Sequence, residues 1–423
     1  MKKHLLPLLL LITLFACNSS KSTHETPNLT IEKLSEKVPP WQNLKEYDEI
    51  VDYMKNLDFK VLESDSLGPH SRLIMELLWH AVEGEVDPLI EKLKAVSDTV
   101  TAEDKLGFYR YLLSQQLSNE GRYQEAVDLL GLSENHLISV LASFPDEEFS
   151  SISEPIDDRL RFSDFGHAVA TVEINGDTLS MWLDTGADYT LLSVSKARKF
   201  GVIMPDGNDL SIGTVTSIEV QAGMGYIPEL KIGNVSIRNH PVLIMDDKDL
   251  LVDLDSIQID FSAIIGWSAL RKMQVSLDEP NLKYETKLSQ ARAISAKNFF
   301  WFGYPALKLQ TESGQSLAFG LDTGMEDSEL KTNILTKADF PQIRTDSVGI
   351  GGVGGIEKQF LQIVDSVSLT LDGYRLKFKA MEVHINLDFP FIYQDGTLGI
   401  DLLKSNKLVI DYPNREFRIN PEE

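Results

Sequence analysis

The stretch Met181-Trp182-Leu183-Asp184-Thr185-Gly186-Ala187-Asp188 decides the fold of this chain, and it recurs in part as Phe319-Gly320-Leu321-Asp322-Thr323-Gly324. In each copy, apolar residues typical of a buried strand are followed by Asp, Thr and Gly. A buried carboxylate is costly unless hydrogen-bond donors surround it, and glycine permits a turn that points backbone N–H groups at the acid. One such tripeptide is weak evidence because its residues are common in turns, whereas two in matching surroundings indicate a repeated unit.

The surroundings of the two copies do match. Upstream, Phe165-Gly166-His167-Ala168 corresponds to Phe302-Gly303-Tyr304-Pro305, and each copy then reads as strand, glycine turn, strand and acid. Downstream, Ile264-Ile265-Gly266 corresponds to Thr397-Leu398-Gly399. The same register pairs Asp278 with Asp411, each at an Asp-x-Pro-Asn sequence that is predicted to form a turn. The chain therefore contains an internal duplication.

On these motifs the chain resembles the aspartic peptidases of the pepsin and retroviral protease superfamily over about residues 160–421. The first motif is closer to the retroviral type, and Ile264-Ile265-Gly266 resembles the family's second signature, which packs beneath the Asp-Thr-Gly loop. The resemblance implies an α+β multidomain chain, in which an α-helical N-terminal domain precedes two all-β acid-protease lobes. These lobes are expected to be closed β-barrels related by a pseudo-twofold axis.

The resemblance implies that Asp184 and Asp322 are the catalytic residues and face each other across a cleft. Two carboxylates that are a few ångströms apart cannot both ionise comfortably, so they share a proton and titrate as a pair. The ionised member takes a proton from water, while the protonated member hydrogen-bonds the scissile carbonyl. This chemistry requires no cofactor and no metal.

The resemblance also assigns roles to the residues that follow each acid. Thr185 and Thr323 are expected to brace the two loops by hydroxyl hydrogen bonds to the opposite lobe. Gly186 and Gly324 are expected to permit the turn of the active-site loop.

Substrate contacts are expected from the next two positions of each motif. Asp188 corresponds to the retroviral-type acid that contacts the substrate main chain, and Ala187 precedes it. The second copy carries Met325 and Glu326 instead. The two lobes are therefore expected to contact substrate asymmetrically.

Pepsin has Ser or Thr directly after the glycine of its motif, but neither lobe of this chain does. Fewer hydroxyl donors beside the carboxyl groups should leave their ionised forms less favoured. The sequence therefore predicts a working pH nearer to neutral than that of pepsin.

The stretch Gly223-Met224-Gly225-Tyr226 is predicted to form the tip of a hairpin, or flap, over the cleft and to contact substrate there. A core or surface position for Tyr226 is the open alternative.

A glycine-rich segment, residues 349–355, takes the equivalent place in the second copy, so Gly351 and Gly352 are also candidate substrate contacts. Residues 349–354 fit the dinucleotide pattern G-x-G-x-x-G as well. That pattern requires a helix to open after the glycines, whereas residues 363–371 have the character of a strand. A mobile flap or loop is therefore the favoured interpretation.

Residues 1–17 are predicted to be a lipoprotein signal peptide. A basic start at Lys2-Lys3 precedes an apolar run that is too short to span a bilayer. Leu14-Phe15-Ala16-Cys17 resembles a bacterial lipobox, which implies that Cys17 is a lipid anchor on the exported side of the cell envelope, in a periplasmic or outer-membrane lipoprotein. A plain secretory signal is the alternative. Cys17 is the only cysteine, so no disulfide forms within the chain.

The rest of the chain divides into a flexible tether (18–29), a helical domain (30–142), a polar linker (143–158) and two lobes (159–290 and 291–423). Apolar residues at helical spacing predict helices at 44–57, 71–82, 87–96, 102–118 and 123–130. Residues 108–130 resemble a tetratricopeptide helix pair. Such a domain either presents a groove to a protein partner or packs on the next domain.

Three interpretations of function follow. The first is an aspartic endopeptidase that is tethered to the membrane and acts on peptides or proteins of the envelope. The second is a non-catalytic peptide-binding or assembly lipoprotein that uses a degenerate peptidase cleft and the helical domain. The third is an envelope scaffold. The net charge of −24 argues against nucleic acid as a partner, and the pairing of the lobes within one chain removes the need for a homodimer.

Overall fold

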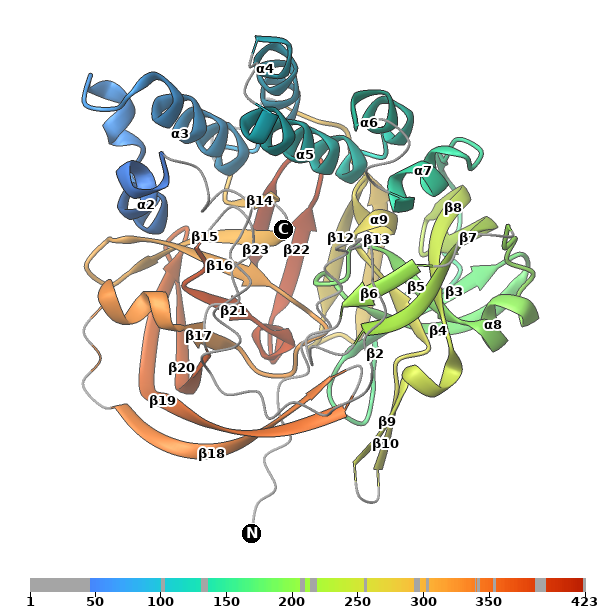
Figure 1. Ribbon diagram of the computed structural model, residues 1–423. Helices are drawn as coiled ribbons and strands as arrows, with labels where there is room; N and C mark the ends of the chain where they lie inside the picture. The colour runs from blue at the N-terminus through green and yellow to red at the C-terminus, as the bar shows by residue number, and fades with distance from the viewer. Residues whose placement is uncertain are drawn as a thin grey trace, which may run out of the picture.

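A computed structural model shows a layer of helices lying along one side of two β-rich lobes (Figure 1). The predicted signal peptide, Cys17, the tether and the start of the helical domain lie outside the residues that the structure describes. These residues are 46–99, 103–130, 136–205, 210–213, 219–254, 257–292, 297–301, 304–338, 340, 343–352, 355–384 and 393–420. In this part of the chain, no helix has the length and apolarity to cross a membrane.

All five predicted helices are present, with somewhat different ends, and a sixth, α7, was not predicted. Local sequence explains several of the ends. Pro69 begins α3 directly after an extended Gly68, because proline fits the first turn of a helix. Leu57 ends α2 in a left-handed conformation. The helices are α2 (Tyr47–Asn56), α3 (Pro69–Val82), α4 (Val86–Thr99), α5 (Glu103–Asn119), α6 (Tyr123–Leu130) and α7 (His136–Ala142), with a 3-10 helix at Phe59–Glu63.

The first lobe is a closed barrel, because its strands pair in the ring β8-β5-β11-β4-β3-β7 and β7 pairs back with β8. β4 lies parallel to β11, and β5 lies parallel to β8. Strand β1 pairs with β8, so part of the predicted linker belongs to this lobe. The strands are β1 (Glu148–Ser151), β2 (Arg161–Phe162), β3 (Ala168–Ile174), β4 (Asp177–Leu183), β5 (Thr190–Ser193), β6 (Leu210–Gly213), β7 (Glu219–Ile232), β8 (Val235–Met245), β9 (Leu251–Leu254), β10 (Ile257–Asp260) and β11 (Ala263–Ile265), with helices α8 (Val194–Lys199) and α9 (Trp267–Leu270).

The second lobe repeats this topology in the ring β15-β16-β21-β17-β20-β19, which closes through the pairing of β15 with β19. β16 lies parallel to β21, as β4 does to β11. The duplication seen in the sequence is therefore a duplication of the fold. The strands are β14 (Phe299–Trp301), β15 (Pro305–Thr311), β16 (Ser316–Leu321), β17 (Glu329–Lys331), β18 (Ile343–Gly352), β19 (Gly355–Leu371), β20 (Tyr374–His384) and β21 (Gly396–Leu398), with 3-10 helices at Thr332–Thr336 and Ile400–Leu403.

One four-stranded sheet joins the two lobes. It consists of β12 (Met273–Asp278), β13 (Lys283–Leu288), β22 (Lys407–Asp411) and β23 (Glu416–Ile419), in the order β13-β12-β22-β23. β12 from the first copy pairs with β22 from the second in antiparallel register. Equivalent strands of the two copies therefore meet at the centre of the sheet.

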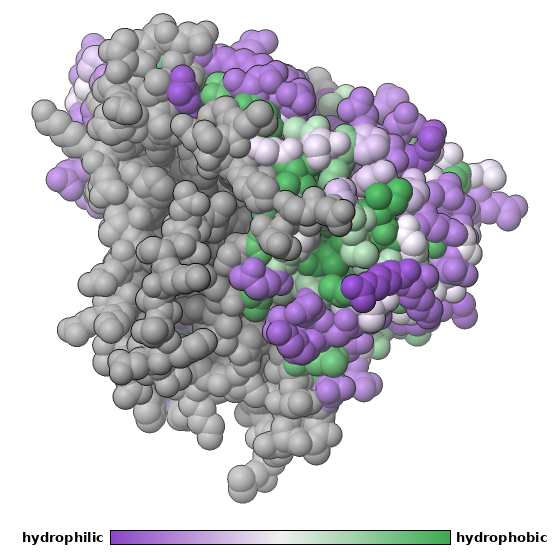
Figure 2. Space-filling model, turned by 45° about the vertical axis from the view of Figure 1, so that its right-hand side comes forward, coloured by the Kyte–Doolittle hydropathy of each residue, from purple (hydrophilic) through white to green (hydrophobic). Residues whose placement is uncertain are grey.

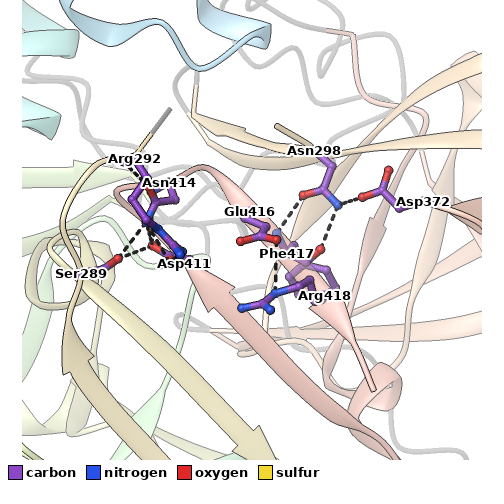
Figure 3. A network of polar contacts seen from close by, with 9 residues as sticks. All are labelled: Ser289, Arg292, Asn298, Asp372, Asp411, Asn414, Glu416, Phe417 and Arg418. Atoms are coloured by element: carbon purple, nitrogen blue, oxygen red, sulfur yellow. Dashed lines mark hydrogen bonds and ion pairs between the residues drawn. The ribbon is translucent and has the colours of Figure 1, made fainter. Parts of the chain in front are cut away.

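The two Asp-x-Pro-Asn sequences turn the outer hairpins of this sheet, as predicted. The backbone N–H of Asn281 donates to Asp278 Oδ1 at 3.1 Å, and that of Asn414 donates to Asp411 Oδ1 at 3.2 Å. Asp411 is fully buried and also accepts from Ser289 Oγ at 2.8 Å (Figure 3).

The prediction of a flap tip at Gly223-Met224-Gly225-Tyr226 is wrong. These residues lie inside β7 and pair with β8, and Met224 is fully buried in the core of the first lobe. Residues 214–218, which connect β6 to β7, lie outside the described residues. The glycine at 225 has a packing role, because a Cβ there would lie 2.6 Å from the carbonyl oxygen of Ile203.

The glycine-rich segment of the second copy does lie at the end of a hairpin. β18 and β19 pair up to Gly352 and Gly355, and Gly351 pairs with Ile356. Because strands lie on both sides and no helix opens after the glycines, the dinucleotide interpretation is excluded. The hairpin runs along the side of the molecule opposite the helices, and its closed end points toward the first lobe (Figure 1).

The helices pack on both lobes. Buried residues of α3 to α5 share one apolar cluster with Phe300, Ala306 and Ala318 of the second lobe. Leu137 and Leu141 of α7 pack with residues of the first lobe. The coloured part of the surface in Figure 2 is largely hydrophilic, with an area of hydrophobic side chains in its middle.

Candidate active site

Each acid of the two Asp-Thr-Gly motifs begins the turn at the end of a barrel strand. Asp184 follows β4 and donates its backbone N–H to the carbonyl of Ile265 at 3.0 Å. Asp322 follows β16 and donates in the same way to Leu398 at 2.9 Å. The second signatures, on β11 and β21, therefore lie directly against the two acid loops.

The two loops meet closely enough to bring the carboxyl groups together. Asp184 and Asp322 are both fully buried. A Cβ on Gly186 would lie 2.5 Å from Asp322 Cγ, and a Cβ on Gly324 would lie 2.5 Å from Asp184 Oδ2. Because each glycine packs against the acid of the other lobe, a residue with a side chain has no room at either position.

Each acid accepts a hydrogen bond from its own loop. The N–H of Gly186 donates to Asp184 Oδ1 at 2.8 Å, and the N–H of Gly324 donates to Asp322 Oδ1 at 2.9 Å. Backbone donors of this kind stabilise a buried carboxylate and fix its orientation.

The threonines lock the two loops to each other. Thr185 Oγ1 donates to the carbonyl of Leu321 at 2.8 Å and accepts from the N–H of Thr323 at 3.0 Å. Thr323 Oγ1 donates to the carbonyl of Leu183 at 2.7 Å and accepts from the N–H of Thr185 at 3.0 Å. These four bonds cross between the lobes with twofold symmetry, so the positions of the acids are coupled.

Burial and mutual proximity make the acids titrate as a pair. Burial raises the pKa of Asp184 to about 6, although the hydrogen bonds from Asp322 and from backbone N–H groups oppose this rise. Burial, the charge of Asp184 and the hydrogen bond between the two carboxyl groups raise the pKa of Asp322 well above its usual range. Near neutral pH the pair therefore holds one proton between two carboxyl groups.

Tyr304 is a residue of the site that the sequence analysis did not single out. Its hydroxyl donates to Asp322 Oδ2 at 3.1 Å, and its side chain is buried. The second lobe therefore obtains a hydroxyl donor for its acid from a residue upstream of the motif, although no Ser or Thr follows Gly324. The signal available in the sequence was the matching position of Tyr304 and His167 in the two copies.

His167 has a different environment in the first lobe. Its ring stacks on Trp182, with ring centroids 4.1 Å apart, and Nδ1 lies 3.3 Å from Ser163 Oγ. Burial lowers the pKa of His167 to about 4, so the ring is neutral over most of the pH range.

Four of the predicted substrate-contact residues lie in the two loops, but not all of their side chains face outward. Ala187 and Met325 are fully buried, and their carbonyls accept from Trp267 N at 2.7 Å and Ile400 N at 2.8 Å. Glu326 is partly exposed, and burial with the charge of the neighbouring Asp327 raises its pKa to about 7.

Asp188 lies beside the helical domain. It lines a small cavity together with Asn119 of α5, Trp301 and Arg271. Burial raises its pKa to about 7. Within the described ranges, no group of three or more His, Cys, Asp or Glu side chains is arranged to hold a metal ion.

Comparison with known proteins supports the resemblance for the first lobe. Residues 170–269 match a family model described as aspartyl protease, and this range includes the first Asp-Thr-Gly motif and the second signature at Ile264-Ile265-Gly266. This part of the chain is therefore similar to the aspartyl protease family. A search of curated proteins finds no match.

Solved structures of two aspartic proteases are similar to the chain. An aspartic proteinase from Irpex lacteus shares 12% identity at a TM-score of 0.38, covering 64% of this chain and 97% of that one. A retropepsin-like aspartic protease from Rickettsia conorii shares 17% identity at a TM-score of 0.22, covering 34% of this chain and 98% of that one.

Proposed function

We propose that the protein is an aspartic endopeptidase that hydrolyses peptide bonds with a water activated between Asp184 and Asp322. The observation that carries this proposal is the reciprocal packing of the two loops, in which each glycine lies against the acid of the other lobe. A pair of buried carboxyl groups that share one proton contains both a base and an acid at the same place.

The reaction follows from that protonation state. The ionised carboxylate accepts a proton from the water, whose oxygen attacks the carbonyl carbon of the scissile bond. The protonated carboxyl donates a hydrogen bond to the carbonyl oxygen as the centre becomes tetrahedral. The crossed threonine bonds hold both carboxyl groups in place, so little rearrangement is required during the reaction.

The β18–β19 hairpin is the candidate cover of a bound peptide. Its closed end points toward the first lobe, on the side of the molecule away from the helices (Figure 1). In this proposal Gly351 and Gly352 contact the substrate through their backbone, as an added strand would.

We also propose that Cys17 tethers the enzyme to the exported side of the bacterial cell envelope and that its substrates are peptides or proteins there. The lipobox-like sequence before Cys17 supports this placement. Replacing Cys17 with Ser should release the protein from the membrane fraction of the producing cells. Retention of the variant in that fraction would count against the tether.

A non-catalytic peptide-binding role is the second candidate. It is favoured by the complete burial of both acids and by the departures at Met325 and Glu326 in the second copy. In this role the cleft would hold a peptide without cleaving it, and the helical domain would recruit a partner.

Cleavage of a peptide library separates the two candidates. Wild type, Asp184→Asn and Asp322→Asn are incubated with the library between about pH 3 and pH 8, and the products are identified by mass spectrometry. We expect each variant to lose cleavage while it retains the fold, because Asn preserves the shape of Asp but cannot act as base or acid. Asp278→Asn is the matched control, since Asp278 bonds with Asn281 in a turn of the joining sheet. Absence of cleavage by wild type, or full activity of either variant, would overturn the peptidase proposal.

A further inference from the structure

We propose that Tyr304 is a positioning residue of the acid pair: its hydroxyl holds Asp322 Oδ2 and favours the ionised form of the pair. The inference rests on the proposed peptidase function and concerns the same site. The hydroxyl donates to Asp322 Oδ2 at 3.1 Å. Asp184 Oδ2 is buried, and no Ser, Thr or Tyr hydroxyl among the described residues donates to it. The two acids, although related by symmetry, are therefore chemically unequal.

Gly320 makes this contact possible. It lies two positions before Asp322, and a Cβ there would be 2.6 Å from Tyr304 Cε1. The equivalent residue of the first lobe, two positions before Asp184, is Trp182, whose ring stacks on His167. The two lobes therefore differ at two neighbouring positions. The first lobe has His167 and Trp182, and the second lobe has Tyr304 and Gly320 at the equivalent places. The empty position at Gly320 lets the tyrosine ring approach its acid.

The tyrosine is a permanent donor. Burial and the negative charge of Asp322 raise the pKa of Tyr304 well above its usual range, so the phenol keeps its proton at neutral and acidic pH. A hydrogen bond from a neutral hydroxyl to a carboxylate stabilises the charged form over the protonated form.

The other groups around the pair do not replace this donor. His167 is neutral, and Tyr412 feels the charge of Asp184 without a hydrogen bond to it. The charge of Glu329 also acts on Tyr304 and raises its pKa further. The titratable groups that face the pair and its tyrosine are Asp184, Asp322, Tyr304, His167, Tyr412 and Glu329.

The consequence is a lower pH limit for activity. The pair must lose one proton before it can act as a base, and the tyrosine bond lowers the pH at which that loss occurs. Tyr304→Phe removes only the hydroxyl. We expect the midpoint of the acid limb of kcat/KM to rise by about one pH unit, with roughly tenfold lower kcat/KM on that limb.

Two further variants make the test specific. Gly320→Ala retains the phenol but displaces the ring, so it should shift the acid limb in the same direction. Tyr284→Phe is the matched control, because Tyr284 is equally buried but donates to the carbonyl of Thr171. It should leave the acid limb unchanged.

The outcomes distinguish this inference from the proposed function. If wild type cleaves peptides but the acid limb of Tyr304→Phe does not move, the inference is overturned and the peptidase proposal stands. If wild type cleaves nothing, the titration of ¹³C-labelled Asp carboxyl groups by NMR tests the tyrosine alone. The inference is supported if the first titration midpoint of the Asp pair is lower in wild type than in Tyr304→Phe. Equal midpoints overturn the inference.

Discussion

At the scale of single residues, the site is defined by how little space surrounds the two acids. At three glycines, a neighbouring side chain lies so close that a Cβ would collide with it. These are Gly186, Gly324 and Gly320. Glycine at the first two positions lets each loop approach the opposite acid, and glycine at the third admits Tyr304. The absence of a side chain at these three glycines therefore determines the positions of Asp184, Asp322 and Tyr304.

The burial of the acids has a cost that depends on pH. The pKa values of Asp184 and Asp322 are both raised in the folded protein. The folded state therefore binds more protons than the unfolded state above about pH 4, and the free energy of unfolding falls as pH rises toward the folded pKa values.

Asp322→Asn should reduce the loss of stability that accompanies ionisation of the buried pair. The melting temperature of the variant, minus that of wild type, is expected to be larger at pH 7 than at pH 4, as measured by calorimetry. Asp278→Asn should show no such trend, because no carboxyl is removed from the buried pair. A difference for Asp322→Asn that shrinks as pH rises would contradict the assignment of a raised pKa.

At the scale of elements, the outer hairpins of the joining sheet use the same turn sequence in different surroundings. Among the described residues, the side chain of Asp278 forms hydrogen bonds only with Asn281 of its own turn. Asp411 bonds with Asn414 and additionally with Ser289 and Arg292 of the segment that connects the two copies (Figure 3). The second turn therefore also fixes the connection between the lobes.

This difference predicts unequal effects of the same substitution. Asp411→Ala should lower the free energy of unfolding by about 2–3 kcal/mol, since it leaves several buried donors unpaired. Asp278→Ala should cost about 1 kcal/mol or less, because water replaces the exposed bonds. Denaturation by urea measures both values, and equal costs would show that the additional contacts of Asp411 contribute nothing.

At the scale of the whole molecule, the helical domain holds the two lobes together from one side. Glu120, between α5 and α6, lies 3.3 Å from Lys272 Nζ of the first copy and 3.3 Å from Arg415 Nη2 of the second. Lys308 of the second lobe lies 3.0 Å from Glu83 at the end of α3. The domain therefore packs on the lobes, which was one of the two arrangements left open by its sequence.

Loss of the bridging carboxylate should weaken this association. Glu120→Gln is expected to lower the free energy of unfolding by about 1–2 kcal/mol, because the buried Arg415 loses its charged partner. Limited proteolysis between the helical domain and the lobes should become faster. Glu125→Gln is the control, since the ion pairs of Glu125 in the described part of the chain are with Arg122 and Lys94, both inside the helical domain. Equal proteolysis of both variants would argue against a bridging role.

The parts of the fold that the sequence predicted correctly are those set by local chemistry that both copies repeat. The acids at the ends of strands and the Asp-x-Pro-Asn turns belong to this class. The helices before the lobes were also predicted from a local pattern, the spacing of their apolar residues. The flap tip at residues 223–226 was misplaced because a glycine that forms a turn and a glycine that admits a neighbouring backbone look identical in sequence. The contact of Tyr304 was missed because it depends on the absence of a side chain at Gly320, which no local pattern reveals.

The pairing of β12 with β22 joins the two copies through their backbones. Backbone hydrogen bonds form this seam between the copies, and such bonds depend little on which side chains the strands carry. A half-length protein with this strand would have to form a homodimer to complete the sheet. In a fused chain, either half can carry substitutions and still pair with the other, because the two halves are covalently linked. A fused chain can therefore carry a tyrosine beside one acid and none beside the other.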